Sequence, residues 1–493
     1  MNRGRLMKRY MLALLSITIP LVISACATNP VTKKSNFVLM SEKQELELGQ
    51  QAAAQVAKQL PLLPETDPLV RYVDSVGQKV AAKADRPELF YHFNVVDNAD
   101  INAFALPGGY IYINRGLLTH LNSEAELAAV LGHEIGHVTA RHAVKQYTKA
   151  QAYQIGMAVT SIFLPMPYGS NMLTDLVATA VIQGYGREAE LQADELSIKY
   201  LTRAGYDPEA TIGILKTLKR LEDLDTKEKT DAGEKVDKYH GAFASHPETE
   251  QRIRDAINLE EEHQGHHGIV NRKAMLTALD GYPYGDSPEQ GAVVGRRFLH
   301  PELGIQLEFP KDWVITNTPS SLQARLRKEK VFFLMQLKEL SKRQSPAEVL
   351  RQAFPSNKLF GIVESDTQAG MPHAEALIRM SAPHVSQAMI SSHVFLIGSK
   401  AFLLSMWADR SVFDQYRDQF SQIARSFKRY DKQKDGDVPR IHLYTWQAGD
   451  SWQKLAERNR QILGRFTPEK LAALNGMSVN SLPAIGQLIK NVQ

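Results

Sequence analysis

The chain has 493 residues, of which 43% are hydrophobic and 23% charged, and its formal net charge is +4. This length predicts about three domains, and the ordinary composition excludes bulk disorder. The small net charge, with no Lys/Arg block beyond the extreme N-terminus, gives no reason to expect a nucleic-acid partner. Cys26 is the only cysteine, so a disulfide within the chain is excluded.

Residues 1–25 have the layout of a secretory signal peptide. Four basic residues precede the apolar run Met11–Ile23, which is too short to span a membrane comfortably. The following residues up to Cys26 resemble a bacterial lipobox, which makes Cys26 the expected lipidation site; a plain signal peptide cut nearby is the alternative. Ala27 stands where an inner-membrane retention signal usually has Asp. The resemblance therefore implies a lipid anchor in the outer membrane, facing the periplasm, with residues 26–40 as a tether.

Residues 41–123 alternate between helical and strand-like patterns. The patterns predict helices, broken by prolines 61, 64 and 68, and then strands on either side of Pro107-Gly108-Gly109. The expected helices and strands cover 41–60, 69–83, 90–96 and 110–113. Ser123 then opens a long helix, and Glu126 is expected to complete a capping box with it.

Further helices are expected between residues 156 and 224. The apolar stretch 156–182 is split by a Pro-rich loop and predicts a buried helical hairpin; a cover over a site is the alternative reading. Helices follow at 187–204 and from Asp207-Pro208 to about Leu224. The charged stretch 226–238 predicts an exposed loop, and 261–296 a linker.

The helix that Ser123 opens carries two histidines four residues apart, His133 and His137, with Glu134 beside the first. At this spacing both imidazoles lie on one face of the helix and can bind the same metal ion. A zinc ion lowers the pKa of a bound water from about 15.7 to about 7, and Glu134 can accept the proton that this water gives up. A catalytic zinc needs a third protein ligand and an open position.

The helix expected at 187–204 offers the third ligand. Glu190 and Asp194 are four residues apart and share a face. Glu190 can bind zinc, while Asp194 can accept a hydrogen bond from the free N–H of a ligand imidazole and so orient it. The pattern predicts one zinc ion per chain, held by His133, His137 and Glu190.

Residues 41–255 resemble the HtpX/BepA type of zinc metallopeptidase, the family that also includes the CaaX prenyl protease. The matching motifs occur in the family's order at 102–109, 133–137, 187–194 and 245–247, with Arg252 after them. The resemblance covers less than half of the chain. It implies a mainly helical, gluzincin-like α+β peptidase domain at 41–260 with Glu190 as the third ligand.

The resemblance also implies roles for residues outside the zinc ligands. The strand after Gly109, formed by Tyr110, Ile111 and Tyr112, is expected to receive the substrate backbone as an added strand, since an edge strand binds extended peptides with little regard for side chains; an ordinary edge or core strand is the alternative. His246 could stabilise an oxyanion, bind zinc as an inhibitory ligand, or have no role. Arg252 is a candidate catalytic residue or a structural ion-pair partner.

The rest of the chain departs from this family. It shows neither the spanning helices of the integral-membrane relatives nor, after residue 260, the helical repeats of the BepA-like relatives. Residues 297–430 are expected to form a small α+β domain and 431–440 a linker. Residues 441–493 resemble a LysM domain with strand–helix–helix–strand order, which implies peptidoglycan as a partner; a degenerate packing module is the alternative.

The sequence therefore predicts a multidomain zinc endopeptidase of the bacterial cell envelope. Its expected substrates are misfolded or misassembled periplasmic and outer-membrane polypeptides. Two other hypotheses stay open at this point. One is a non-enzymatic adaptor whose metal site is structural or inhibited, although Glu134 argues against it. The other is a cell-wall-binding lipoprotein in which the terminal module dominates.

Overall fold

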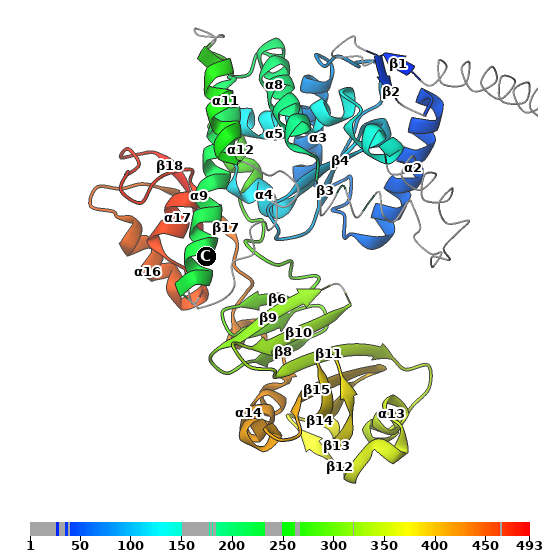
Figure 1. The fold of residues 1–493 in the computed structure, drawn as a ribbon. Helices are drawn as coiled ribbons and strands as arrows, with labels where there is room; N and C mark the ends of the chain where they lie inside the picture. The colour runs from blue at the N-terminus through cyan, green and yellow to red at the C-terminus, as the bar shows by residue number, and fades with distance from the viewer. Residues whose placement is uncertain are drawn as a thin grey trace, which may run out of the picture.

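The computed structural model shows three regions, which are helices around a small sheet, a large antiparallel sheet, and a terminal module beside the helices (Figure 1). It describes residues 26–28, 35–37, 40–149, 177, 180, 184–231, 249–261, 267–318, 320–463 and 466–493. The signal peptide, the side chain of Cys26, most of 156–182 and His246 lie outside the described part. Among the described helices, none combines the length and the apolar character needed to cross a membrane.

The first two helices confirm the expected pattern with one correction. Ser41 caps α2 (Glu42–Gln59) and forms a capping box with Gln44. Pro68, expected to interrupt the chain, instead begins α3 (Pro68–Ala81), and Asp67 caps that helix. Proline is favoured at the first helical position because its missing N–H would have no partner there.

A three-stranded sheet lies beside these helices, with the strand order β3-β5-β4. In this sheet β5 (Tyr110–Asn114) pairs in parallel with β3 (His92–Val96) and antiparallel with β4 (Ala103–Leu106). The turn η1 (Pro107–Gly109) joins β4 to β5. Gly108 and Gly109 have φ angles of 77° and 95° there, a conformation that side chains with a Cβ rarely adopt.

Five helices pack together on the side of this sheet where the histidine motif lies. They are α4 (Arg115–His120), α5 (Glu124–Thr139), α8 (Arg187–Ala204), α9 (Glu209–Asp231) and α11 (Thr249–Glu261). The expected loop at 226–238 is wrong in its first part, because α9 continues to Asp231. Ion pairs one turn apart, Lys219–Asp223 and Lys229–Asp225, favour this charged extension as a helix.

The expected linker at 261–296 also needs correction. It contains α12 (Arg272–Leu279), whose Met275 and Leu279 are fully buried in the same core as α3 and α5. Three apolar side chains four and three residues apart (Met275, Leu276 and Leu279) drive this burial, which the polar residues around position 265 obscure in the sequence. The strand β6 (Ala292–Val294) also lies in this stretch.

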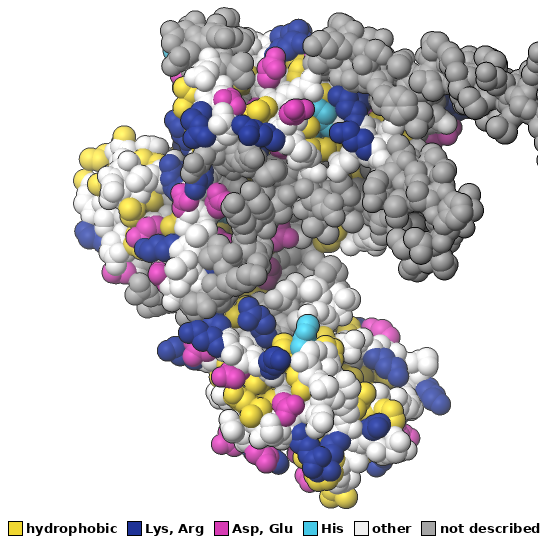
Figure 2. Space-filling view, in the orientation of Figure 1, with side chains coloured by type: hydrophobic (Ala, Val, Ile, Leu, Met, Phe, Trp, Pro, Cys, Tyr) yellow, Lys and Arg dark blue, Asp and Glu magenta, His cyan; other side chains and the backbone are white. Residues whose placement is uncertain are grey.

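Residues 292–429 form two antiparallel sheets with two flanking helices. The seven-stranded sheet has the order β12-β13-β14-β15-β11-β10-β9, and the four-stranded sheet has the order β16-β8-β7-β6. The strands are β7 (Arg297–His300), β8 (Ile305–Glu308), β9 (Trp313–Thr318), β10 (Ser321–Leu326), β11 (Phe332–Glu339), β12 (Leu359–Gln368), β13 (Met371–Ala382), β14 (Val385–Ile397), β15 (Lys400–Asp409) and β16 (Lys428–Arg429). The helices α13 (Pro346–Ala353) and α14 (Phe413–Ser426) complete the region. Basic and acidic side chains are interspersed over the face of it that Figure 2 draws.

The terminal module has the expected strand–helix–helix–strand order. It consists of β17 (Ile441–Thr445), α16 (Trp452–Leu463), α17 (Pro468–Leu474) and β18 (Leu488–Val492), and the two strands pair antiparallel. A short helix, α15 (Lys432–Asp435), lies in the segment expected to be a linker before it.

This module shares its core with the helical region instead of standing apart. Ile441, Trp452 and Val492 belong to the same cluster of buried residues as Leu131 of α5. Lys490 of β18 is fully buried, and its ammonium donates hydrogen bonds to the carbonyl oxygens of Thr119 (2.6 Å) and Leu121 (2.7 Å). Burial lowers the pKa of Lys490 well below its usual value. The end of the chain is therefore anchored just before the start of α5.

Candidate metal centre

The helix α5 carries His133, Glu134 and His137 into the interior of the helical region. Ser123 caps it by accepting a hydrogen bond from the Glu126 amide (3.1 Å). The expected capping box is only half present, because the Glu126 carboxylate accepts from the Asn122 amide (2.6 Å) instead of reaching back to Ser123. All three motif side chains are buried.

Two glycines let α8 approach the motif face of α5 closely. A Cβ added at Gly136 would lie 3.2 Å from the Ala193 carbonyl oxygen, and one added at Gly132 would lie 3.2 Å from the Ser197 hydroxyl. That hydroxyl also donates a hydrogen bond to the Ala129 carbonyl (2.8 Å). This close packing brings the acidic residues of α8 within reach of the histidines.

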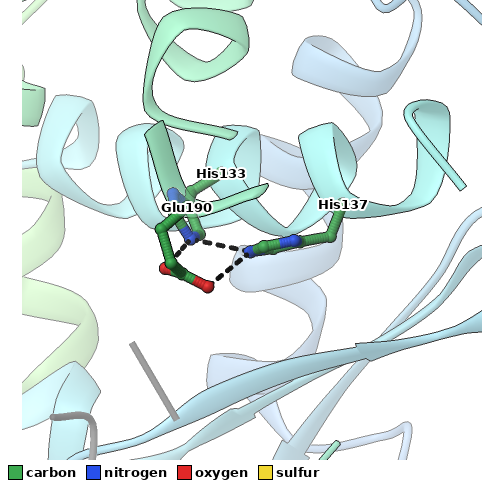
Figure 3. A group of neighbouring side chains, drawn as sticks. All are labelled: His133, His137 and Glu190. Atoms are coloured by element: carbon green, nitrogen blue, oxygen red, sulfur yellow. Dashed lines mark hydrogen bonds and ion pairs between the residues drawn. The ribbon is translucent and has the colours of Figure 1, made fainter. Parts of the chain in front are cut away.

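The side chains of His133, His137 and Glu190 converge on one point between α5 and α8 (Figure 3). The two Nε2 atoms lie 3.0 Å apart. The Glu190 oxygens lie 3.4 Å from His133 Nε2 and 3.5 Å from His137 Nε2. One potential ligand atom from each of the three residues lies within 4.8 Å of the other two, and the residues are buried. Two imidazole nitrogens and a carboxylate oxygen are the donor set of many catalytic zinc sites.

Asp194 holds the first histidine from behind. Its Oδ1 accepts a hydrogen bond from His133 Nδ1 (2.9 Å), which leaves His133 Nε2 to point toward Glu190. Burial raises the pKa of Asp194, but Arg252 and His133 outweigh this effect and hold it below its usual value. Burial likewise lowers the pKa of His133, but Asp194 and Glu190 outweigh it and raise the pKa to about 9. A metal must therefore displace a proton from His133.

Arg252 of α11 binds the same carboxylate with two parallel hydrogen bonds. Its Nε donates to Asp194 Oδ2 and a terminal nitrogen donates to Oδ1, both at 2.7 Å. Another terminal nitrogen lies 3.4 Å from Glu190 Oε2. Of the two readings of Arg252, this geometry favours the structural ion pair, which positions Asp194 and Glu190.

Two residues that the sequence reading missed hold the second histidine. His142 Nε2 donates to Gln192 Oε1 (3.0 Å), so His142 Nδ1 can accept from His137 Nδ1, 2.8 Å away. Burial lowers the pKa of His142 to about 4, which keeps its ring neutral and able to accept. These two hydrogen bonds leave the lone pair of His137 on Nε2, facing Glu190. The signal in the sequence was a third histidine, five residues after His137.

Two residues of the α5 motif also line a small pocket of about 50 Å³. His133 and Glu134 form part of its wall, together with Ala103 of β4, Asp194 and Arg252. Its remaining lining is mostly apolar, from Leu117, Ala129, Val130, Thr211, Ile214, Leu215 and Leu218. Glu134 therefore has a cavity beside it, next to the converging ligands.

Comparison with known proteins places this region in a family. Residues 69–260 match the model of Peptidase family M48. This part of the chain is a peptidase M48 domain. The domain contains every described residue of the metal centre.

Three curated relatives are similar to part of this chain. The "Beta-barrel assembly-enhancing protease" of Yersinia pestis is 31% identical over 229 residues, 44% of this chain and 44% of that protein. The protein of the same name in Escherichia coli is 30% identical, covering 48% of each chain. The "Mitochondrial metalloendopeptidase OMA1" of Schizosaccharomyces pombe is 30% identical over 46% of this chain and 64% of its own length. The match thus spans about half the length of the bacterial relatives.

The donor set of the M48 domain fits zinc. Asp194 and His142 each bind the Nδ1 atom of one candidate ligand histidine, so in the neutral rings both Nε2 lone pairs face Glu190. Hydrogen-bonded partners of this kind orient imidazoles for a metal and strengthen them as ligands. His133, His137 and Glu190 could therefore hold one zinc ion, as M48 metallopeptidases do.

One expected site element of the M48 domain is placed differently. The strand expected to receive substrate includes Tyr110, Ile111 and Tyr112, but β5 lies in the middle of its sheet, and both of its edges are paired with β3 and β4. The expectation that Gly109–Tyr112 offers an open edge is therefore wrong. In this order of strands the edge nearest the pocket belongs to β4, whose Ala103 lines it.

Tyr185 connects that edge strand to the metal centre. Its ring stacks on His137 with centroids 4.2 Å apart, and its hydroxyl donates a hydrogen bond to the Ala105 carbonyl of β4 (3.3 Å). Burial raises the pKa of Tyr185 above its usual value. The ring of Tyr185 thus holds β4 and the second ligand histidine in a fixed relation.

Proposed function

We propose that this chain is a zinc-dependent endopeptidase of the bacterial cell envelope. The observation that carries the proposal is the convergence of His133, His137 and Glu190 beside the buried carboxylate of Glu134. A purely structural zinc site has four protein ligands and needs no base beside it. The described residues supply three ligands and, besides Asp194, which Arg252 binds, a further carboxylate in Glu134, which suits a hydrolytic site.

Each polar residue of the site would have a defined task in hydrolysis. A bound zinc ion would act as a Lewis acid, lowering the pKa of water and polarising the scissile carbonyl. The Glu134 carboxylate would accept the proton of the attacking water and deliver it to the leaving amine. Asp194 and His142 would keep the two ligand imidazoles in the required tautomers. Arg252 would hold Asp194 and Glu190 in place.

We infer that the substrate binds as an added strand along β4. The pocket beside Glu134 includes Ala103, so a peptide running along this edge would pass the metal centre. Main-chain pairing reads little side-chain information, which suits unfolded polypeptides as substrates. A test is a set of peptides with single N-methylated amides. Alternate N-methylations should lower kcat/KM strongly, whereas a uniform tolerance of N-methylation would argue against strand addition.

The expected position in the envelope and the role of His246 belong to this proposal as well. Lipidation of Cys26 would anchor the chain in the outer membrane, where misassembled envelope proteins would be substrates. The bacterial relatives carry the name of an assembly-enhancing protease, which agrees with such a role. His246 would act near the metal, either on an oxyanion or as a zinc ligand that keeps the enzyme inactive.

The terminal module gives a second candidate activity, which is binding to peptidoglycan. Its strand–helix–helix–strand order is the one expected of a LysM-like domain. Deleting the module would expose the shared core, so the test uses its exposed side chains Leu482 and Ile485. If binding occurs there, Leu482→Asp with Ile485→Asp should reduce co-sedimentation with peptidoglycan. No co-sedimentation of the unaltered chain would reject this activity.

The test of the endopeptidase proposal is the digestion of casein or a denatured porin. Glu134→Gln should abolish cleavage while keeping bound zinc, because the substitution removes the base and no ligand. Glu88→Gln is a matched control, since that carboxylate is exposed on the surface of the same domain. Cleavage by Glu134→Gln at the rate of the unaltered chain would overturn the mechanism.

A further inference from the structure

Two buried histidines and a glutamate meet on the seven-stranded sheet, far along the chain from the peptidase site. His373 and Glu375 lie on β13, and His393 lies on β14 directly across from Glu375. Residues two apart on a strand share a face, so all three side chains project from one face of the sheet. That face is covered by α14, whose Phe413 and Phe420 line a cavity together with Glu375 and His393.

The potential ligand atoms of these residues are close together. His373 Nε2 lies 3.1 Å from His393 Nδ1, and His393 Nδ1 lies 3.2 Å from Glu375 Oε2. All three atoms fall within 4.8 Å of one another. Both histidines are buried, while the Glu375 side chain is 45% exposed. A metal ion could therefore reach the group from the side of Glu375.

Neighbouring polar groups can direct a lone pair of each ring toward this point. Asp366 Oδ1 accepts a hydrogen bond from His373 Nδ1 (2.6 Å), which leaves the lone pair of the neutral ring on Nε2. His393 Nε2 lies 3.0 Å from the Ser391 hydroxyl, and donation to that oxygen leaves the lone pair on Nδ1. Two lone pairs and a carboxylate would then face one another, and a cation between them would offset their repulsion. A carboxylate behind a ligand histidine is the usual support of a metal site.

We propose that His373, His393 and Glu375 bind a divalent transition metal at a second site. Two imidazoles and a carboxylate suit borderline ions such as Zn²⁺, Ni²⁺ or Cu²⁺. Three protein ligands leave a four-coordinate ion one position for water or a small ligand. A cavity of about 380 Å³ adjoins the group and has room for such a ligand.

The cavity combines apolar and polar walls. Its lining comprises Phe360, Gly361, Ile362, Glu364, Glu375, Ala376, Leu377, Ser391, His393, Phe413, Arg417, Phe420 and Ser421. Glu364 of β12 pairs directly with Glu375 of β13, so another carboxylate stands next to the proposed ligands. The alternative to a metal is a hydrogen-bonded group in which His393 Nδ1 donates its proton to Glu375.

The test measures the metal content of the full chain by mass spectrometry after dialysis against Zn²⁺. The Glu190→Ala background removes the ion of the peptidase site, so the proposal predicts one remaining metal per chain. Adding Glu375→Gln should weaken the remaining binding by ~10-fold or more, and adding His393→Gln should abolish it. His442→Gln, on an exposed ring of β17, should leave it unchanged.

Two further measurements separate loss of metal binding from loss of folding. His393 is buried, so near-ultraviolet circular dichroism must show that His393→Gln is folded; the half-exposed Glu375 gives an independent variant with little risk to folding. Zn²⁺ should also raise the melting temperature of the Glu190→Ala chain, and Glu375→Gln should reduce that rise. A Glu190→Ala chain without bound metal, or metal retained in full after both further substitutions, would overturn the second site.

Discussion

The Nδ1 atoms of His137 and His142 lie 2.8 Å apart, so one imidazole must donate its proton to the other. Gln192 accepts from the far nitrogen of His142 and thereby decides the direction. The result is a relay of three side chains from Gln192 of α8 through His142 to His137 of α5, a proposed zinc ligand. This relay and the Asp194–His133 bond do the same work on the two ligand histidines.

The relay predicts that His142→Ala weakens zinc binding without removing a ligand. We expect the zinc dissociation constant to rise ~10- to 100-fold, as for other groups that support metal ligands. Competition with a chelator measures it. His120→Ala is the matched control, because His120 is a buried histidine that bonds to the Gly116 carbonyl instead. Unchanged zinc affinity in His142→Ala would show that the relay does not orient His137.

We predict that replacing Arg252 lowers the stability of the folded chain. Its two bonds compensate the buried carboxylate of Asp194, so Arg252→Met would leave that charge without its main partner. Breaking a buried ion pair in this way costs about 3–5 kcal/mol. Urea unfolding should show this loss, whereas Arg254→Met, on the exposed neighbour, should cost little. Equal stability of the two variants would contradict the structural role of Arg252.

The buried contacts of Lys490 lead us to predict that the terminal module and the peptidase domain unfold together. Lys490→Met would leave the Thr119 and Leu121 carbonyls without their buried donor, at a cost of about 1–3 kcal/mol. Lys454 also donates to a carbonyl in this module but is exposed, so Lys454→Met should be nearly neutral. Calorimetry should show one transition containing both parts. A separate, unshifted transition for the module would contradict the shared core.

His120 should make the stability of the fold depend on pH. Burial lowers the pKa of His120 to about 4, although its bond to the Gly116 carbonyl opposes this effect. Below the ordinary pKa of 6.5 the unfolded chain takes up the proton first, so stability falls as the pH drops from 6.5 toward 4. Between pH 7.5 and pH 5 the difference between the folded and unfolded pKa of His120 should alone lower the free energy of unfolding by about 2 kcal/mol.

Comparing variants isolates that contribution. His120→Gln should lose about 2 kcal/mol less than the unaltered chain over this pH interval, because all the other titrating groups are shared. His92→Gln removes an exposed ring and should follow the unaltered chain. Unfolding curves at both pH values measure the differences. Parallel pH profiles of the unaltered chain and His120→Gln would show that His120 is not buried as described.

The metal centre was readable from sequence because its parts are local. His133 and His137 share a helix face by spacing alone, and the pair Glu190 and Asp194 repeats that spacing on a second helix. The order of strands was not readable in this way. Whether β5 is an edge or a centre depends on pairing with β3, which no local pattern specifies. The same limit hid the contact between His142 and Gln192, fifty residues apart in the chain.

Other differences lie in polar stretches, which sequence patterns predict as loops but which here contain helices. The charged end of α9 is helical, and its ion pairs Lys219–Asp223 and Lys229–Asp225 each join residues four apart, one helical turn. The polar stretch before α12 predicts a linker, but Met275 and Leu279 just after it are core residues. The terminal module was expected to follow a linker, but Lys490 and the apolar side chains of β18 tie it to α5. Such docking is a long-range property of the folded chain.

The zinc content of Glu190→Ala tests the central claim most directly. The measurement is best made in a chain that also carries His393→Gln, which removes the second proposed metal site. The account predicts one zinc per chain and casein cleavage before Glu190→Ala is added, and loss of both afterwards. One zinc per chain and unchanged cleavage after Glu190→Ala would contradict it, because Glu190 would then not be a ligand of the zinc ion.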